Sequence, residues 1–242
     1  MLPKIDVPVY SVKLLSNGKT IKFRPFTVKE EKLFLMALES NDAETTINTI
    51  KQVINNCILD DVNVSTLAMF DIEYIFLHLR AKSIGEEIQL KYKCNNDVIV
   101  EDETKKCGNL VEFSFNILDV KPTKFDNHNN KIEITDKLGI VMKYPNFELI
   151  EKYKDDETVD SLVLMIIGCI DYIYDAEAIY YAKDSTEKEL IEFVDSLQTK
   201  ELEKIKLFFD TAPKLQKKLN FKCNKCNHEE EIDLEGIQSF FG

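Results

Sequence analysis

The chain has 242 residues, of which 44% are hydrophobic and 31% are charged, and its formal net charge is −12. This composition is typical of a soluble globular protein, and the length fits one large domain or two smaller ones. The negative charge argues against direct binding of nucleic acid, because lysine and arginine side chains carry most of the affinity for phosphates. The longest apolar run, residues 162–170, is about half as long as a membrane-spanning helix. We therefore expect neither a nucleic-acid-binding surface nor a membrane-spanning segment.

The first residues of the chain lack the apolar core of a secretory signal. We therefore expect the protein in a reducing cytoplasm. Cysteines that are spaced along a chain in that compartment bind metal more often than they form disulfides.

The N-terminal part alternates between strand and helix patterns. Residues 9–15 and 20–24 are expected to form a hairpin across the Asn17-Gly18 turn. Thr27 and Glu30 have the spacing of a capping box, which predicts a helix start. Residues 43–59 and 67–81 then repeat apolar side chains at helical spacing. Cys57 lies on the apolar face of the first of these helices, where a cysteine normally acts as a small apolar filler.

Two pairs of cysteines are flanked by short strand-like runs. Cys94 and Cys107 lie between alternating segments, and so do Cys223 and Cys226. Two hairpins that each present two thiols match the zinc-ribbon arrangement, in which one ion has four cysteine ligands. Four thiolates leave no open coordination position, so such an ion would be structural rather than catalytic.

The first cysteine pair departs from the usual spacing. Twelve residues separate Cys94 from Cys107, whereas a ribbon knuckle normally has about two. Gly108 directly after the pair favours a tight turn. If the long knuckle does not close, His228 could replace Cys94 or Cys107 as a ligand. The alternative for the whole set is that the cysteines are unrelated core residues.

The middle of the chain is expected to be mainly helical from residue 146 to 216, after two short strands at 132–135 and 139–144. Residues 161–174 are apolar on nearly all sides, which predicts a central core segment. His128 lies in an asparagine-rich turn and is expected to be solvated. At the end of the chain, Phe240 and Phe241 require burial, either against the core or against a partner.

Catalytic motifs are missing from the sequence. It contains no glycine-rich phosphate loop, nucleophile elbow or metalloprotease helix motif, and its 43 carboxylate residues single out no acid and base pair. We therefore expect a protein that is not an enzyme.

These patterns predict an α+β fold, with a helical core, several β-hairpins and a split four-cysteine zinc-ribbon-like element. We expect three structural regions along the chain. Residues 1–118 form an N-terminal α/β region that ends in the first cysteine hairpin. Residues 119–217 are mainly helical. Residues 218–242 hold the second cysteine hairpin and an apolar C-terminus, which packs on the first hairpin.

Several stretches resemble a known family. They are KFRPFTVKEEK at 22–32, FDIEYIF at 70–76, LRAKSIGE at 79–86 and, after the final Cys-x-x-Cys, LEGIQSFF at 234–241. Together they resemble the baseplate hub subunit and assembly protein family of T-even-type contractile-tailed bacteriophages, over residues 1–118 and from 218 onward. The resemblance implies a non-enzymatic hub subunit or assembly factor in virion morphogenesis. It implies other hub or tail proteins as partners, and the host cytoplasm as the place of assembly. Retention in the virion tail baseplate stays open.

The resemblance also indicates candidate residues for contact with a partner protein. Arg24, Pro25 and Phe26 lie in the first resembling stretch, and Phe240 and Phe241 lie in the last. A rival hypothesis is a zinc-ribbon adaptor that acts on nucleic acid or a polymerase, which would need a basic groove.

Overall fold

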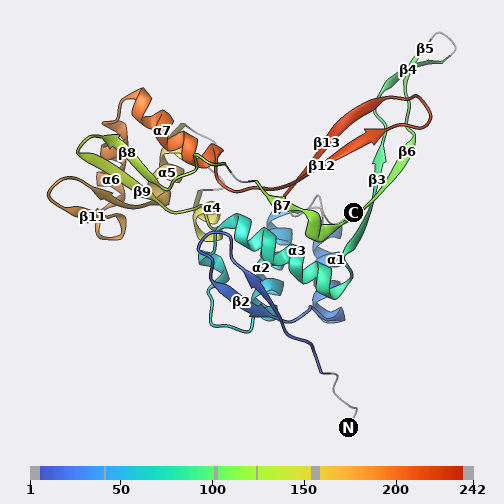
Figure 1. Cartoon of the computed structure of the whole chain (residues 1–242), viewed down its shortest axis with the longest axis horizontal. Helices are drawn as coiled ribbons and strands as arrows, with labels where there is room; N and C mark the ends of the chain where they lie inside the picture. The colour runs from blue at the N-terminus through green and yellow to red at the C-terminus, as the bar shows by residue number, and fades with distance from the viewer. Residues whose placement is uncertain (1–5, 41, 101–102, 124, 154–158, 237–242) are drawn as a thin grey trace. The chain divides into compact units, whose positions relative to one another are not determined.

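The computed structural model describes residues 6–40, 42–100, 103–123, 125–153 and 159–236 (Figure 1). The chain divides into two compact units. Unit 1 comprises Met1–Val62, Ile72–Thr123 and Lys214–Gly242, and unit 2 comprises Asn63–Asp71 and Lys124–Pro213. Most of the expected first and last stretches therefore belong to unit 1, and most of the expected middle stretch belongs to unit 2.

Unit 1 contains a helical core with a small hairpin against it. Its helices are α1 (Val28–Glu39), α2 (Ala43–Cys57) and most of α3 (Met69–Ser83). Strands β1 (Tyr10–Lys13) and β2 (Thr20–Phe23) pair as an antiparallel hairpin. An isolated bridge from Phe23 to Ile58 ties this hairpin to the end of α2. The apolar faces predicted from the sequence are buried, including Ile54 and Phe76, each 0% exposed.

Two longer hairpins complete unit 1. Strand β3 (Glu87–Lys93) pairs with β6 (Leu110–Asn116), and β12 (Leu215–Lys222) pairs with β13 (Glu229–Glu235) and with β7 (Lys121–Pro122). The short 3-10 turn η2 (Ile117–Asp119) leads from β6 to β7. Figure 1 shows the β3–β6 and β12–β13 hairpins extending away from the helices of unit 1. Their side chains share one small core, in which Phe221 is 1% exposed and packs beside Tyr92 and Phe113.

Unit 2 is a four-stranded antiparallel sheet in the order β11-β10-β9-β8, with helices packed on it. Its strands are β8 (Lys131–Thr135), β9 (Leu138–Met142), β10 (Ile170–Tyr174) and β11 (Ile179–Tyr181). Its helices are α4 (Phe147–Tyr153), α5 (Val159–Cys169), α6 (Glu187–Asp195) and α7 (Thr199–Asp210), with 3-10 turns η1 (Val64–Thr66) and η3 (Ala182–Asp184). Alternate strand residues such as Ile140 and Ile170 face a core that includes Ile166 and Phe208.

One segment of unit 2 differs from the expectation. The apolar run at 161–174 does not continue as one helical segment, because α5 ends at Cys169 and Ile170 begins β10. An apolar run alone does not distinguish a buried helix from a buried strand. Here the aromatic and β-branched residues Tyr172, Ile173 and Tyr174 pair with β9 on one side and β11 on the other.

The predicted fold class is confirmed. The structure is a mixed α+β fold with several antiparallel hairpins and a cluster of four cysteines. Among the residues that the structure describes, no helix is long and apolar enough to cross a membrane.

Candidate metal centre

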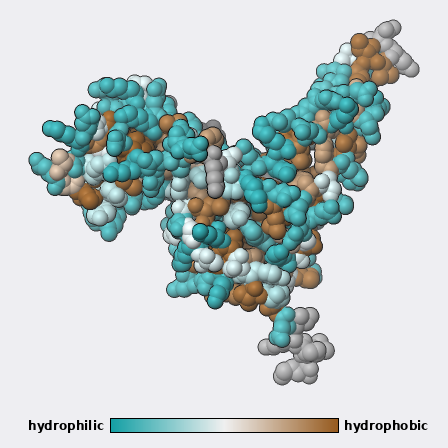
Figure 2. Space-filling model, viewed as in Figure 1, coloured by the Kyte–Doolittle hydropathy of each residue, from teal (hydrophilic) through white to brown (hydrophobic). Residues whose placement is uncertain are grey.

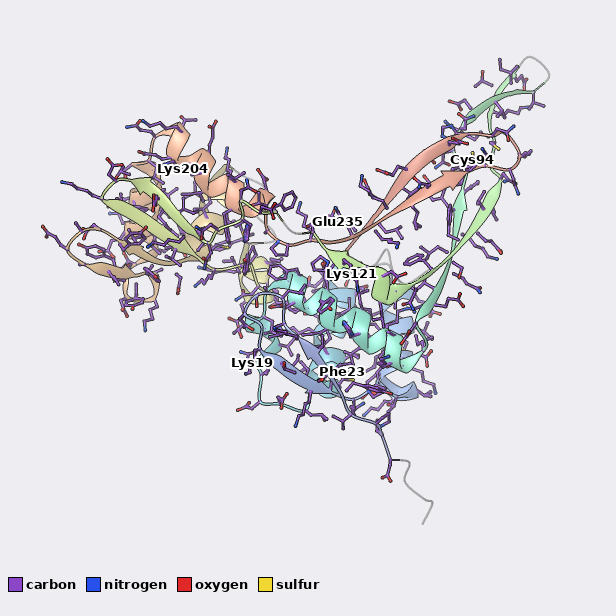
Figure 3. All side chains as sticks on the ribbon, in the orientation of Figure 1. Lys19, Phe23, Cys94, Lys121, Lys204 and Glu235 are labelled. Carbon is purple, nitrogen blue, oxygen red and sulfur yellow. The ribbon has the colours of Figure 1, made fainter. Side chains whose placement is uncertain are left out.

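The sulfur atoms of Cys94, Cys107, Cys223 and Cys226 all lie within 4.8 Å of one another. The Sγ atoms of Cys94 and Cys226 are 3.6 Å apart, and those of Cys107 and Cys223 are 3.8 Å apart. A tetrahedral zinc ion with Zn–S bonds of about 2.3 Å separates its sulfur ligands by about 3.8 Å. The group therefore has the dimensions of a four-cysteine zinc site. In Figure 3, Cys94 lies at the end of β3, beside the β12–β13 turn.

The two cysteine turns have the same backbone hydrogen bonds. In the first, the Cys94 amide donates to the Asn109 carbonyl at 2.8 Å, and the Gly108 amide donates to the Cys94 carbonyl at 3.0 Å. In the second, Cys223 donates to the His228 carbonyl at 2.8 Å, and Asn227 donates to the Cys223 carbonyl at 2.9 Å. The two turns are thus copies of one knuckle.

Backbone angles also show that the two cysteine turns are equivalent. Gly108 has φ 65° and Asn227 has φ 58°, so each knuckle has a left-handed residue directly after its second cysteine. Glycine and asparagine are the residue types that tolerate this conformation best.

The long spacing of the first pair results from an inserted hairpin. Strands β4 (Asp97–Val100) and β5 (Glu103–Lys106) pair with each other from Asp97↔Lys106 to Val100↔Glu103. The Cys107 amide donates to the Asn96 carbonyl at 2.8 Å, which closes the base of the insertion. Because the insertion begins and ends at one point, it lengthens the chain without separating the two thiols.

The surroundings of the sulfurs are buried and rich in amide donors. Cys94 and Cys223 are 0% exposed, and Cys107 is 7% exposed. The Asn109 side-chain amide donates to the Cys223 sulfur at 3.5 Å, and the Asn96 side-chain amide donates to Cys226 at 3.8 Å. Amide donors of this kind stabilise thiolates, which are the form of cysteine that binds metal.

The titration of the thiols follows from these contacts. Burial by itself raises the pKa of Cys223, but hydrogen bonds from the backbone amides of Cys226 and Lys225 outweigh it and lower this pKa to about 6. Burial raises the pKa of Cys94 to about 12. Four thiolates packed this closely repel one another, so a bound divalent cation would offset a charge that the protein alone does not neutralise.

The side chain of His228, the alternative ligand, contacts the Glu230 carboxylate. Its Nε2 lies 3.6 Å from the Glu230 carboxylate, and its ring lies 6.4 Å from that of Phe221. The clustered group comprises the four cysteine sulfurs and does not include His228. Cys57 and Cys169 are also outside it. Burial raises the pKa of Cys57 to about 11, as expected for an apolar filler.

Arg24, Pro25 and Phe26 connect several elements of unit 1. The Arg24 guanidinium donates to the Glu30 carboxylate at 2.9 Å and to the Asn56 carbonyl at 3.1 Å. Its other terminal nitrogen donates to the Pro25 carbonyl at 3.0 Å. Phe26 is 8% exposed. These contacts give the stretch a structural role, and its contact with a partner stays a prediction. Phe240 and Phe241 lie outside the described residues.

His128 was expected to be solvated, and this was wrong. Its Nδ1 is 2.9 Å from the Thr211 hydroxyl, its Nε2 is 2.8 Å from the Tyr144 hydroxyl, and its ring stacks 5.3 Å from Phe208. The partners come from positions far along the chain, and no local pattern around residue 128 reveals them. The residue acts as a hydrogen-bonded link inside unit 2.

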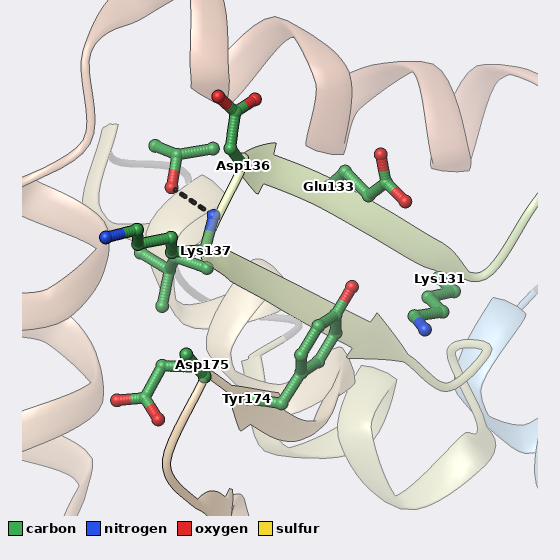
Figure 4. Close-up of a pocket in the computed structure, with 9 residues that line it drawn as sticks. Lys131, Glu133, Asp136, Lys137, Tyr174 and Asp175 are labelled. Atoms are coloured by element: carbon green, nitrogen blue, oxygen red, sulfur yellow. Dashed lines mark hydrogen bonds between the residues drawn. The ribbon is translucent and has the colours of Figure 1, made fainter.

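A shallow pocket of about 430 Å³ lies at the β8–β9 turn of unit 2 (Figure 4). Several of its polar groups have contacts within the unit. The Lys131 ammonium lies 4.8 Å from the centre of the Tyr174 ring, and the Asp175 carboxylate accepts from two backbone amides and from the Tyr180 hydroxyl. The side chains that line this pocket include no cysteine, histidine or serine nucleophile.

Comparison with known proteins gives a match over nearly the whole chain. The model of a family described as T4 bacteriophage base plate protein matches residues 7–242. The baseplate hub assembly protein gp26 of Enterobacteria phage T4 is 24% identical over 233 residues, which cover 96% of this chain and 97% of that protein. No solved structure matches the chain. These matches confirm the resemblance found in the sequence and extend it through the middle of the chain.

Proposed function

Because the chain belongs to the T4 bacteriophage base plate protein family, we propose that it takes part in building the hub of a phage tail baseplate, as a hub subunit or assembly factor. The observation that carries this proposal is the similarity to a hub assembly protein over 96% of the chain. The partners are other hub or tail proteins, and the encounter takes place in the host cytoplasm during assembly. The net charge of −12 favours partners with basic surfaces.

The protein acts through binding rather than catalysis. A four-cysteine site has no open position for a substrate or an activated water. In the pocket at the β8–β9 turn, the Lys131 ammonium lies over the Tyr174 ring and the Asp175 carboxylate accepts a hydrogen bond from Tyr180. Both features support a structural role.

The four-cysteine group binds one structural zinc ion, with Cys94, Cys107, Cys223 and Cys226 as ligands. The sulfur distances, the two matching knuckles and the amide donors around the thiols support this assignment. A structural zinc contributes on the order of 10 kcal/mol to folding. The ion would therefore hold the cysteine ends of the β3–β6 and β12–β13 hairpins together, next to the small core around Phe221.

Infected bacteria provide the test of the hub role. A tagged copy of the chain is expressed during infection, and tail intermediates and mature virions are purified separately and analysed by mass spectrometry. We expect the chain in intermediates that contain hub proteins. Its presence in virions as well would identify a hub subunit, and its presence in intermediates alone would identify an assembly factor. Absence from both fractions would contradict the proposal.

A further inference from the structure

The sheet of unit 2 protects one of its two edges. Strands β8 and β11 are the edge strands in the order β11-β10-β9-β8. On β8, the Lys204 ammonium of α7 donates to the carbonyls of Glu133 and Ile134 at 2.7 and 3.0 Å. The pairing of β8 with β9 also shifts register between Glu133 and Thr135. Lysines and bulges at a sheet edge hinder pairing with another chain, so β8 is poorly suited to accept a further strand.

The β11 edge lacks this protection. Its three residues, Ile179, Tyr180 and Tyr181, are 54%, 49% and 45% exposed. Within the described part of the chain, β11 pairs with β10 alone. Figure 2 shows a small hydrophobic area amid hydrophilic surface in the part of unit 2 where Figure 1 places β11. Exposed apolar side chains on an open sheet edge favour the addition of another strand.

The hydrogen bonds of the β10–β11 hairpin determine which backbone groups of β11 face outward. The Asp175 amide donates to the Ala178 carbonyl at 3.0 Å, and two residues further along each strand Ile173 pairs with Tyr180. Hydrogen-bonded and non-hydrogen-bonded pairs alternate in an antiparallel ladder, so Tyr180 directs its amide and carbonyl at β10. Its two neighbours in β11 therefore direct their amides and carbonyls away from β10.

This outward edge is complementary to itself. When two copies pair antiparallel about a twofold axis at Tyr180, Ile179 of each lies opposite Tyr181 of the other. The outward amides and carbonyls of these residues can then exchange hydrogen bonds in both directions. The Ser185 hydroxyl donates to the Tyr181 carbonyl at 3.3 Å, and a carbonyl oxygen with one such donor can accept a second hydrogen bond.

The flanking charges fit the same arrangement. Glu177 precedes the strand and Lys183 follows it in η3, and both are exposed. Antiparallel pairing about Tyr180 brings the Glu177 end of one copy beside the Lys183 end of the other. The neighbouring acidic residues, Asp175 and Asp184, fall opposite uncharged residues. Opposite charges across paired strands stabilise the pairing, and like charges oppose it.

We propose that two copies of this chain associate through their β11 strands, in an antiparallel register centred on Tyr180, so that their two sheets become one continuous sheet. The inference is independent of the metal site and of the hub role. The three half-exposed side chains of β11 supply roughly 300 Å² from each copy. This is less than the ~800 Å² per partner of a standard interface, so we expect a dimer of micromolar affinity.

Sedimentation equilibrium of the purified full chain tests the inference. Between about 1 and 100 µM, we expect the average mass to rise from 28.0 kDa towards twice that value. Tyr181→Pro should weaken the dimer at least about 10-fold, because it removes an outward amide. The position has φ −73°, which proline adopts, and an edge strand tolerates proline where its amide faces solvent. Tyr181→Ala removes the ring but keeps the amide, and should weaken the dimer less.

A charge exchange tests the register and stays decisive if Tyr181→Pro does not fold. Glu177→Lys should weaken the dimer by about 5-fold, and adding Lys183→Glu should restore it. Effects of the single changes on the fold of one copy would not produce this rescue. The control is Leu207→Ala on α7, which removes another half-exposed apolar side chain of unit 2 and should leave the dimer unchanged.

The outcomes decide between the possible occupants of the edge. A chain that stays at 28.0 kDa over the whole range would overturn the inference, and so would a dimer that neither Tyr181→Pro nor Glu177→Lys weakens. A monomeric chain whose recovery of hub proteins falls in Tyr181→Pro would show that a strand of another protein is the occupant, and the inference would be wrong. The hub role is tested separately by the presence of the chain in tail intermediates.

Discussion

The ion pair between Arg24 and Glu30 gives a quantitative prediction about unit 1. The Glu30 residue is 5% exposed, and its carboxylate accepts from the Arg24 guanidinium and from the Thr27 amide at 2.7 Å. Burial by itself raises the pKa of Glu30, but the hydrogen bonds from Arg24 and Thr27 outweigh it and lower the pKa from 4.5 to about 2. This difference corresponds to about 3 kcal/mol of stability at neutral pH.

We expect Arg24→Ala to lower the free energy of unfolding by about 2 kcal/mol at pH 7, because the Thr27 hydrogen bonds remain and part of the stabilisation is kept. The pKa of Glu30 is lower in the folded state than in the unfolded state. Its contribution is therefore complete above about pH 5 and is lost as the pH falls from about 4.5 towards 2. The difference between wild type and variant should shrink over the same range.

Urea unfolding followed by circular dichroism measures this difference at pH 7 and at successively lower pH. Lys29→Ala is the matched control, because it removes a positive charge from an exposed position on α1. If Arg24→Ala is no less stable than Lys29→Ala at pH 7, or if its loss does not depend on pH, the structural role assigned to Arg24 is wrong. A stable Arg24→Ala variant that fails to recover hub proteins would instead support a partner contact.

Other changes test individual positions. Gly108→Val should lower the stability by about 1–2 kcal/mol in thermal unfolding, because the position has φ 65° and a β-branched residue is strained there. Cys57→Ala should leave the zinc content unchanged, as measured by elemental analysis, because Cys57 is outside the sulfur group. Gly139→Ala should lower the melting temperature, since the added Cβ would lie 2.2 Å from the Tyr174 hydroxyl and the ring would have to move.

The cysteine group shows how much of the site local sequence patterns can predict. Alternating runs and cysteine spacing were enough to predict two hairpins with converging thiols, because strands that flank a tight turn present the turn residues together. The spacing of Cys94 and Cys107 looked irregular in the sequence. In three dimensions the intervening residues fold back as β4 and β5, and this depends on pairing with β5, whose residues Glu103–Lys106 include no apolar side chain.

Other features depended on contacts between distant parts of the chain. The change from α5 to β10 at Ile170 is decided by pairing with β9 and β11, which an apolar run does not encode. His128 is held by Thr211 and Tyr144, 83 and 16 residues away along the chain. Capping signals were more reliable because they act within one turn. The Glu30 carboxylate accepts a hydrogen bond from the Thr27 amide at 2.7 Å, as expected for the capping box predicted at the start of α1.

We propose that Cys94, Cys107, Cys223 and Cys226 bind one zinc ion. Zinc X-ray absorption spectroscopy of the purified protein, combined with elemental analysis, measures this coordination. We expect one zinc per chain with four sulfur neighbours at about 2.3 Å, and loss of that signal in Cys223→Ser. Protein without zinc, or zinc with nitrogen or oxygen in place of a sulfur ligand, would contradict the claim.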